Sequence, residues 1–154
     1  MVFDELDKKI LDLLQENARL SNKEIAEKIG LSTTPTYDRI KKLENEGVIE
    51  KYTAILNESK TGNEFTVFCL INLIDQSRKT FKEVEKILKS KPEIASIYSV
   101  TGPYGYILKI VVKDIKAFNH FIVNDFSNIK QISKYESMVA LDNIKNTPYL
   151  NIND

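Results

Sequence analysis

The chain has 154 residues, and its 22 Lys and Arg balance 22 Asp and Glu, so the formal net charge at pH 7 is zero. Hydrophobic residues make up 42% and charged residues 29%, a composition typical of a soluble globular protein with one ordinary domain or two small ones. The single cysteine, Cys69, excludes an internal disulfide, and its apolar neighbours predict a buried core thiol in a reducing cytoplasm. With His120 as the one histidine, neither a metal site nor metal catalysis is expected.

Neither a targeting segment nor a membrane span is predicted. Asp4 and Glu5 occupy the place where a signal peptide carries its basic region. The longest apolar stretch, residues 67–74, is interrupted by Asn72 and is too short to cross a bilayer. We therefore expect a cytoplasmic protein without a membrane partner.

The first predicted element is a helix that Asp4 caps and that runs to about Asn17. Its buried stripe follows the spacing i, i+4, i+7 and i+8 and consists of Leu6, Ile10, Leu13 and Leu14. A single helix of this length buries little apolar surface, so it is expected to pack against the helices that follow.

Two further helices joined by a tight turn are predicted next. Ser21 and Glu24 have capping-box spacing at the start of the second helix, and Gly30 is expected to end it in the left-handed conformation. Ser32 or Thr33 is expected to cap the third helix. The pattern therefore predicts a helix-turn-helix.

The third helix carries hydroxyl side chains near its start and cations further on, as suits a recognition helix that enters the DNA major groove. Its candidate DNA contacts are Ser32, Thr33, Thr34, Thr36, Tyr37, Arg39 and Lys42. Two of these roles stay open on the sequence alone. Arg39 can bond a guanine edge or a phosphate, and Tyr37 can instead pack beneath the helix.

The charge balance supports DNA binding only locally. Residues 1–60 contain 10 Lys and Arg against 12 Asp and Glu, whereas DNA-binding domains are often basic overall. Binding driven by counterion release alone should therefore be weak, and a dimer or larger assembly is expected to add contacts.

A change of rhythm follows the third helix. Gly47 is expected to end that helix, and residues 48–56 change to a period near two, which predicts a strand or wing. Residues 57–64 are polar and contain Gly62, which marks a domain boundary. The predicted organisation is a helix-turn-helix domain over 1–50, a hinge strand and linker over 51–63, and a second domain over 64–154.

The second domain is predicted to be a ferredoxin-like α+β sandwich. Strands are expected over 65–74, 94–101, 106–112 and 132–144, with helices that start near Thr80 and Asp114 and a tight turn over 102–105. The order βαββαβ places both helices on one face of the sheet. Because the strand over 65–71 is apolar on both faces, the uncovered face is expected to pack against a second copy. Such a dimer supplies the two recognition helices that a two-fold operator needs.

Three motifs then occur in order along the chain. Residues 30–54 read GLS-x-x-P-x-x-x-RI-x-x-LE-x-x-GVI-x-x-Y-x-A, residues 100–109 read VTG-x-x-x-Y-x-LK, and residues 139–145 read V-x-L-x-x-IK. Together they resemble the Lrp/AsnC (feast/famine) transcription regulators over essentially the whole chain. The resemblance implies a winged helix-turn-helix domain, a hinge strand, and a RAM-type effector domain that pairs into dimers and assembles into octamer-like rings.

The resemblance also implies a sequence-specific transcriptional regulator, with no catalysis and no cofactor, that responds to an amino acid or related metabolite at an effector-domain interface. The implied effector residues are Thr101, Gly102, Pro103, Tyr104, Gly105, Tyr106, Tyr135 and Ser137.

The effector turn departs from the pattern of its relatives, which commonly carry Asp in this turn and Thr on the last strand. Residues 102–106 contain no carboxylate, and the aligned strand positions are Tyr135 and Ser137. Glu136 is expected to point to the other face. Because a desolvated ammonium needs an anionic or acceptor partner, our hypothesis is that the effector is not a typical amino acid or is absent. A hairpin needed only for its geometry is the alternative.

Two other functions compete with that of a regulator: a metabolite-binding module that acts on an enzyme, and an architectural DNA-packaging protein. No nucleophile–base pair, metal set or phosphate-binding Gly-rich loop supports an enzyme. Because Arg39 is the only arginine of the recognition helix, we expect an A·T-rich pseudo-palindromic operator with half-sites spaced by about 10 bp or a multiple. If Arg39 reads a base, replacing it with Ala should cost about 1–3 kcal/mol of binding.

Overall fold

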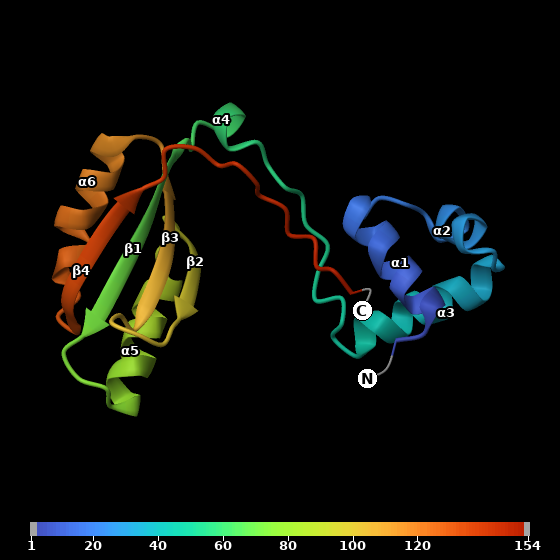
Figure 1. The fold of residues 1–154 in the computed structure, drawn as a ribbon, viewed down its shortest axis with the longest axis horizontal. Coiled ribbons are helices and arrows are strands. Elements are labelled where there is room, and N and C mark those ends of the chain that lie inside the picture. The colour runs from blue at the N-terminus through green and yellow to red at the C-terminus, as the bar shows by residue number, and fades with distance from the viewer. Residues whose placement is uncertain (1–2, 153–154) are drawn as a thin grey trace. The chain divides into compact units, whose positions relative to one another are not determined.

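The computed structural model describes residues 3–152, which form two compact units (Figure 1). The first unit contains the residues up to Ile55 together with those from Lys145 onward, and the second runs from Leu56 to Ile144. The elements, in chain order, are α1 (Glu5–Glu16), α2 (Asn22–Ile29), α3 (Thr33–Asn45), α4 (Glu58–Thr61), β1 (Phe65–Leu73), α5 (Arg78–Lys89), β2 (Ile94–Ser99), β3 (Tyr106–Val112), α6 (Ile115–Asn124), a 3₁₀ turn (Phe126–Asn128) and β4 (Ile132–Val139). None of the described helices is long and apolar enough to cross a membrane.

Side-chain caps fix the ends of the helices in the first unit. The Asp4 side chain accepts hydrogen bonds from two backbone N–H groups of the first turn of α1, and Ser21 and Glu24 form a reciprocal capping box at α2. Gly30 ends α2 with φ 74°, in the left-handed region that glycine adopts without strain. The predicted starts of α1 and α2 and the predicted end of α2 are therefore confirmed.

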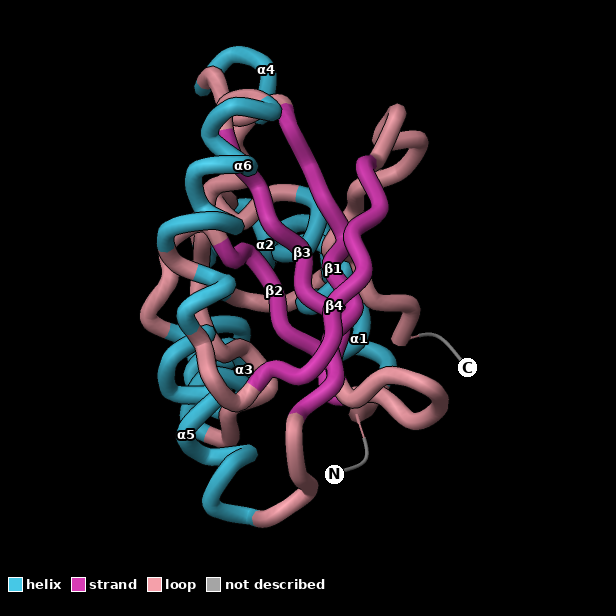
Figure 2. The backbone as a smooth tube through the Cα atoms, turned by 90° about the vertical axis from the view of Figure 1, so that its left-hand side faces the viewer, coloured by secondary structure: helices cyan, strands magenta, loops and turns pink. Residues whose placement is uncertain are grey.

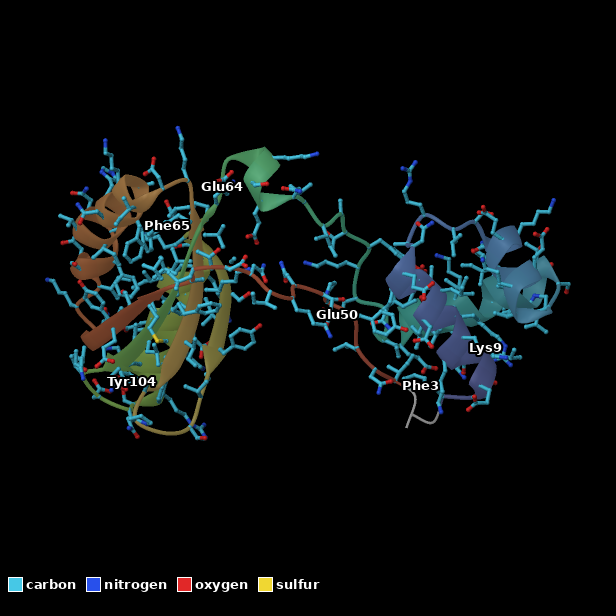
Figure 3. The ribbon with its side chains drawn as sticks, turned by 45° about the horizontal axis from the view of Figure 1, so that its top comes forward. Phe3, Lys9, Glu50, Glu64, Phe65 and Tyr104 are labelled. Atoms are coloured by element: carbon cyan, nitrogen blue, oxygen red, sulfur yellow. The ribbon has the colours of Figure 1, made fainter. Side chains whose placement is uncertain are left out.

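The three helices enclose a small apolar core. Its buried members are Ile10, Leu11, Ile25, Ile40 and Leu43. Burying each such side chain contributes about 1.5–3 kcal/mol relative to exposure. The buried face of α1 differs slightly from the predicted stripe. Leu11, which was not predicted, is buried, whereas Leu13 and Leu14 pack only partly against the core. Charged side chains such as Lys9 lie on the outside of the unit (Figure 3).

The last described residues of the chain complete the first unit rather than the second. The Gln15 side-chain amide donates to the Leu150 carbonyl at 3.1 Å, and the Leu150 N–H donates back to the Gln15 amide oxygen at 2.7 Å. The Tyr149 hydroxyl donates to Asp12 at 2.7 Å, and Ile152 packs against the helical core. The segment predicted as 64–154 is therefore divided between the two units.

The strand or wing predicted over 48–56 does not form in the described part of the chain. The N–H groups of Val48 and Ile49 both donate to the Leu43 carbonyl, at 2.9 and 3.1 Å, so these residues fold back on the end of α3 and pack partly against the core. Residues 51–57 have no regular secondary structure. A strand needs a partner to pair its backbone groups, and within residues 3–152 none pairs with this segment.

The second unit is a four-stranded antiparallel sheet in the order β2-β3-β1-β4, with α5 and α6 on one face (Figures 1 and 2). This is the predicted ferredoxin-like arrangement. Alternation along β1 sends Val67, Cys69 and Ile71 into the helix-covered core, where they meet Val84 and Phe121. Burial raises the pKa of the Cys69 thiol, so this cysteine is buried as predicted.

Several element bounds differ from the prediction. The strand β4 stops at Val139 rather than continuing to Ile144, because Ala140 makes the last bond, to the Thr66 carbonyl, before the chain leaves the sheet. The helix predicted to start near Thr80 begins at Arg78, and the Ser77 side chain caps it. The short helix α4 lies in the segment predicted as a polar boundary, and Asn57 at its start and Gly62 at its end are the signals that could have revealed it.

Tyr106 makes the stability of the second unit sensitive to alkaline pH. Its ring is buried and its hydroxyl donates to Glu85 at 3.1 Å; burial, and then this carboxylate, raise its pKa to about 12. Between the unfolded value near 10 and this higher value, the folded state holds the proton more tightly. The free energy of unfolding should therefore fall as the pH rises through that range.

Thermal unfolding at pH 8 and pH 11 checks this effect in Tyr106→Phe and, as the matched control, Tyr98→Phe on an exposed position of β2. We expect the loss between the two pH values to be smaller in Tyr106→Phe than in the wild-type protein or the control. Equal losses in all three proteins would contradict the assignment.

Candidate nucleic-acid interface and effector turn

The first turn of α3 presents hydroxyl groups at its surface. Ser32 occupies the N-cap position without making a side-chain cap bond, and Ser32, Thr33 and Thr34 are exposed. Thr36 differs, because it is fully buried and its hydroxyl donates to the Ser32 carbonyl at 3.0 Å. Its prediction as a DNA contact is therefore corrected: Thr36 closes the first turn internally and is not accessible to a base.

Arg39 is held in an ion pair with the start of α1. Its Nη1 donates to the Asp7 Oδ1 at 2.6 Å and to the Asp4 Oδ2 at 2.7 Å. The Asp7 side chain is only 9% exposed, whereas that of Asp4 is 53% exposed. Hydrogen bonds to these two carboxylates raise the pKa of Arg39. The arginine predicted to face DNA therefore also fixes α3 against α1.

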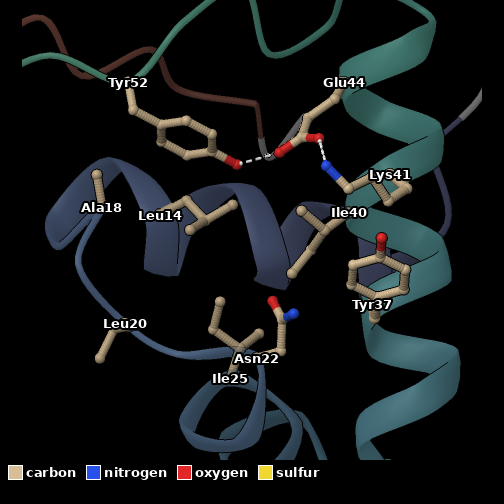
Figure 4. A pocket seen from close by; sticks show the side chains of 10 residues that line it. All are labelled: Leu14, Ala18, Leu20, Asn22, Ile25, Tyr37, Ile40, Lys41, Glu44 and Tyr52. Carbon is tan, nitrogen blue, oxygen red and sulfur yellow. Dashed lines mark hydrogen bonds and ion pairs between the residues drawn. The ribbon is translucent and has the colours of Figure 1, made fainter.

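Tyr37 lies between the two roles considered for it. Its ring lines a pocket of about 170 Å³ whose apolar floor includes Leu14, Ile25 and Ile40 (Figure 4). The side chain is nevertheless 44% exposed, and Lys41 Nζ lies 5.8 Å from its ring centroid. Tyr37 therefore packs on one side and remains accessible on the other.

The segment that follows α3 is fastened to that helix at the mouth of the same pocket (Figure 4). The Tyr52 hydroxyl donates to Glu44 at 3.0 Å, and Lys41 Nζ lies 2.6 Å from the other oxygen of this carboxylate. Desolvation, and then the bond to Glu44, raise the pKa of Tyr52 to about 12. Tyr52, which lies in the segment predicted as a hinge strand and linker, thus makes a fixed contact between that segment and α3.

Removing the Arg39 side chain should destabilise the helical unit. In Arg39→Ala, the nearly buried Asp7 carboxylate loses its charged partner, and we expect the free energy of unfolding to fall by about 1–3 kcal/mol. Urea unfolding measures this change. Lys42→Ala, an exposed position one turn further along α3, is the matched control and should change stability by less than about 0.5 kcal/mol. Equal effects in the two variants would show that the ion pair contributes nothing.

The effector turn is shaped by an asparagine at the end of β1. The Asn72 side-chain amide donates to the Pro103 carbonyl at 2.7 Å, and the Gly105 N–H donates to the Asn72 side-chain oxygen at 3.0 Å. Gly102 has φ 123°, a conformation that favours glycine. The turn borders a hollow of about 560 Å³ whose lining includes Thr101, Gly102, Pro103, Tyr104 and Gly105. Five of the predicted effector residues are therefore brought together.

The other three predicted effector residues, Tyr106, Tyr135 and Ser137, do not line this hollow, and their part in effector binding stays a prediction. Tyr106 is buried under the helices, the Tyr135 ring meets Phe126 edge-on with centroids 5.4 Å apart, and the Ser137 hydroxyl faces the Cys69 sulfur at 3.7 Å. These positions alternate onto the helix-covered face of the sheet, away from the face that carries Asn72.

Two other residues of β4, Glu136 and Lys134, lie near Tyr104 of the turn. The Glu136 carboxylate close to the Tyr104 hydroxyl raises the pKa of Tyr104. Lys134 Nζ lies 2.8 Å from Glu136 and 5.7 Å from the Tyr104 ring centroid. Glu136 does point to the other face from Tyr135 and Ser137, as predicted, but that face is the one that meets the turn. Asn72 is a polar residue in a largely apolar strand, and this pattern could have indicated that the open face of the sheet contacts the turn.

Comparison with known proteins gives the same two-part organisation. Residues 3–50 match the family described as winged helix-turn-helix DNA-binding, and residues 66–150 match the Lrp/AsnC ligand binding domain. These matches and the two folds define a DNA-binding regulator with a separate ligand-binding domain.

The chain belongs to the Lrp/AsnC family of DNA-binding transcriptional regulators, which are not enzymes. It is 36% identical to the transcriptional regulator AzlB of Bacillus subtilis, over 96% of this chain and 94% of that protein. It is 31% identical to the leucine-responsive regulatory protein of Rhizobium meliloti, over 92% and 91%. A solved transcriptional regulator of Neisseria meningitidis in complex with L-methionine is 30% identical, with a TM-score of 0.93 over 99% of this chain and 98% of that one.

Proposed function

We propose that the chain recognises DNA through the exposed first turn of α3 and the cations that follow it. Ser32, Thr33 and Thr34 offer hydroxyl groups to base edges, and Lys42 offers a charge to a phosphate. The observation that carries this proposal is the exposure of these four side chains on a helix whose opposite face is fixed in the core by Ile40 and Leu43.

We further propose that the active form is a dimer that pairs through the open face of the sheet and reads a pseudo-palindromic, A·T-rich operator. Phe68, Tyr98 and Met138 are exposed large side chains on the strands, and Phe68 stands opposite both Lys109 and Met138 in the sheet register. Covering this face removes apolar surface from water. Rings of such dimers, which the resemblance implies, would extend the same arrangement.

Selection of bound duplexes from a random pool, at a stated salt concentration, tests DNA recognition. We expect enrichment of an A·T-rich palindrome with half-sites spaced by about 10 bp or a multiple. Thr34→Ala should weaken or alter one position of each half-site, whereas Lys42→Ala should weaken all sequences alike. Enrichment of a G·C-rich motif would refute the operator prediction, and the absence of any enrichment would refute sequence recognition.

For regulation, we propose that the hollow beside the effector turn binds a small polar molecule. Amide and hydroxyl groups of Asn72, Gln76, Thr101 and Ser133 line it, and its lining residues include no charged side chain. The Glu136 carboxylate beside Tyr104 does not line the hollow and is already paired with Lys134 at 2.8 Å. A ligand ammonium would therefore lack a free carboxylate partner, so a typical amino acid is disfavoured. The L-methionine complex of the Neisseria relative makes the amino acids the compounds to test first.

Isothermal titration of the twenty amino acids measures this preference. We expect no micromolar binding of typical amino acids to the wild-type chain. A compound that does bind should lose affinity in Asn72→Ala, because the turn loses the two hydrogen bonds that shape it. Lys116→Ala, at an exposed position of α6 away from the turn, should bind as the wild type does. Micromolar binding of several amino acids would refute the proposed selectivity.

A further inference from the structure

The charged surface around Arg39 is not positive overall. A hollow of about 450 Å³ next to α3 is lined by Asp4, Asp7, Pro35, Asp38, Arg39 and Lys42. Two of these residues, Asp4 and Asp7, lie at the start of α1, and the others belong to α3, the helix that is expected to approach DNA. Three carboxylates therefore surround the two cations of this hollow. A phosphate that approaches Arg39 meets this negative charge at short range.

The two carboxylates bound to Arg39 have different structural duties. Asp7 is nearly buried and also accepts the backbone N–H of Asp4, so it is a fixed partner of the arginine. Asp4 is half exposed, and its two carboxylate oxygens have different partners. Oδ1 accepts hydrogen bonds from the N–H groups of Leu6 and Asp7, whereas Oδ2 accepts one from Arg39. The helix cap needs only the first oxygen, and a neutral Asn side chain caps a helix as well as Asp does.

Arg39 has donors that these contacts do not use. Both bonds to Asp4 and Asp7 are made by Nη1, whereas a guanidinium carries further N–H groups on Nη2 and Nε. The arginine can therefore keep its bond to Asp7 and still present a second edge to a phosphate. The negative charge of Asp4, 2.7 Å from Nη1 of the same guanidinium, opposes this contact.

We propose that the Asp4 carboxylate lowers the affinity of the chain for DNA by competing with a phosphate for Arg39. This inference rests on the proposed placement of α3 against DNA. If each helical unit alone binds DNA weakly, stable binding requires the helical units of two protomers to contact the same duplex together. Asp4 thereby favours paired half-sites over isolated ones and over DNA of random sequence.

Asp4→Asn and Glu5→Gln provide a matched test. Each removes one negative charge near the start of α1, but the Glu5 carboxylate contacts Lys8 at 3.2 Å rather than Arg39. Fluorescence anisotropy measures the affinity of each protein for a random-sequence duplex over a series of salt concentrations. At low salt, Asp4→Asn should bind about threefold more tightly than the wild-type protein. The plot of log affinity against log salt should steepen by about 0.9 for each additional phosphate that the variant neutralises. Glu5→Gln should stay close to the wild type in both measurements.

Equal affinity and equal salt slope in the two variants would overturn the proposal. Thermal unfolding checks that Asp4→Asn retains the helix cap; if that variant is unstable, Asp4→Ser, which also caps without charge, replaces it. A failure of the wild type and of every variant to bind DNA would instead overturn the placement of α3 against DNA, so the two failures are distinguishable.

Discussion

The alternation of side chains along β1 is the constraint on which the second unit depends. This central strand pairs with β3 on one side and β4 on the other, so it has no free edge. Successive residues must then face either the two helices or the open side of the sheet. Val67, Cys69 and Ile71 build the core, Phe68 and Leu70 make the open face apolar, and Asn72 continues that face to the effector turn. One strand thus links the core, the open face and the candidate ligand site.

The first unit depends on a comparable tie between α1 and α3. A core of five buried aliphatic side chains is small, and it specifies the helix packing less fully than a larger core would. The Arg39 pair with Asp4 and Asp7 joins the cap of α1 to the middle of α3. Through Asp7, a residue of the first turn of α1 orients α3, the helix that we propose approaches DNA.

Local signals made much of this fold predictable from the sequence. The capping residues Asp4, Ser21 and Asp114 and the left-handed Gly30 act on their own neighbours, so short-range patterns identify them. The order of strands and helices in the second unit followed from periodicity for the same reason.

The features that were missed depend on long-range pairing. A period near two over 48–56 describes an extended chain but does not supply the partner that a strand requires. The burial of Thr36, the pairing of Arg39 with Asp7 and the placement of Glu136 beside Tyr104 involve contacts that sequence spacing does not fix. The candidate residues do lie on the expected helix and turn, but the burial and the face of several of them depend on these long-range contacts, and their roles stay predictions.

Because residues 149 and 150 contact α1, the helical unit is discontinuous in sequence, and the whole sheet unit is inserted between its two pieces. During synthesis from the N-terminus, α1 to α3 leave the ribosome long before Tyr149, Leu150 and Ile152 do. The sheet unit can therefore fold while the helical unit still lacks the segment that binds Gln15 and Asp12. The helical unit is therefore begun before the sheet unit is made and is completed only after it.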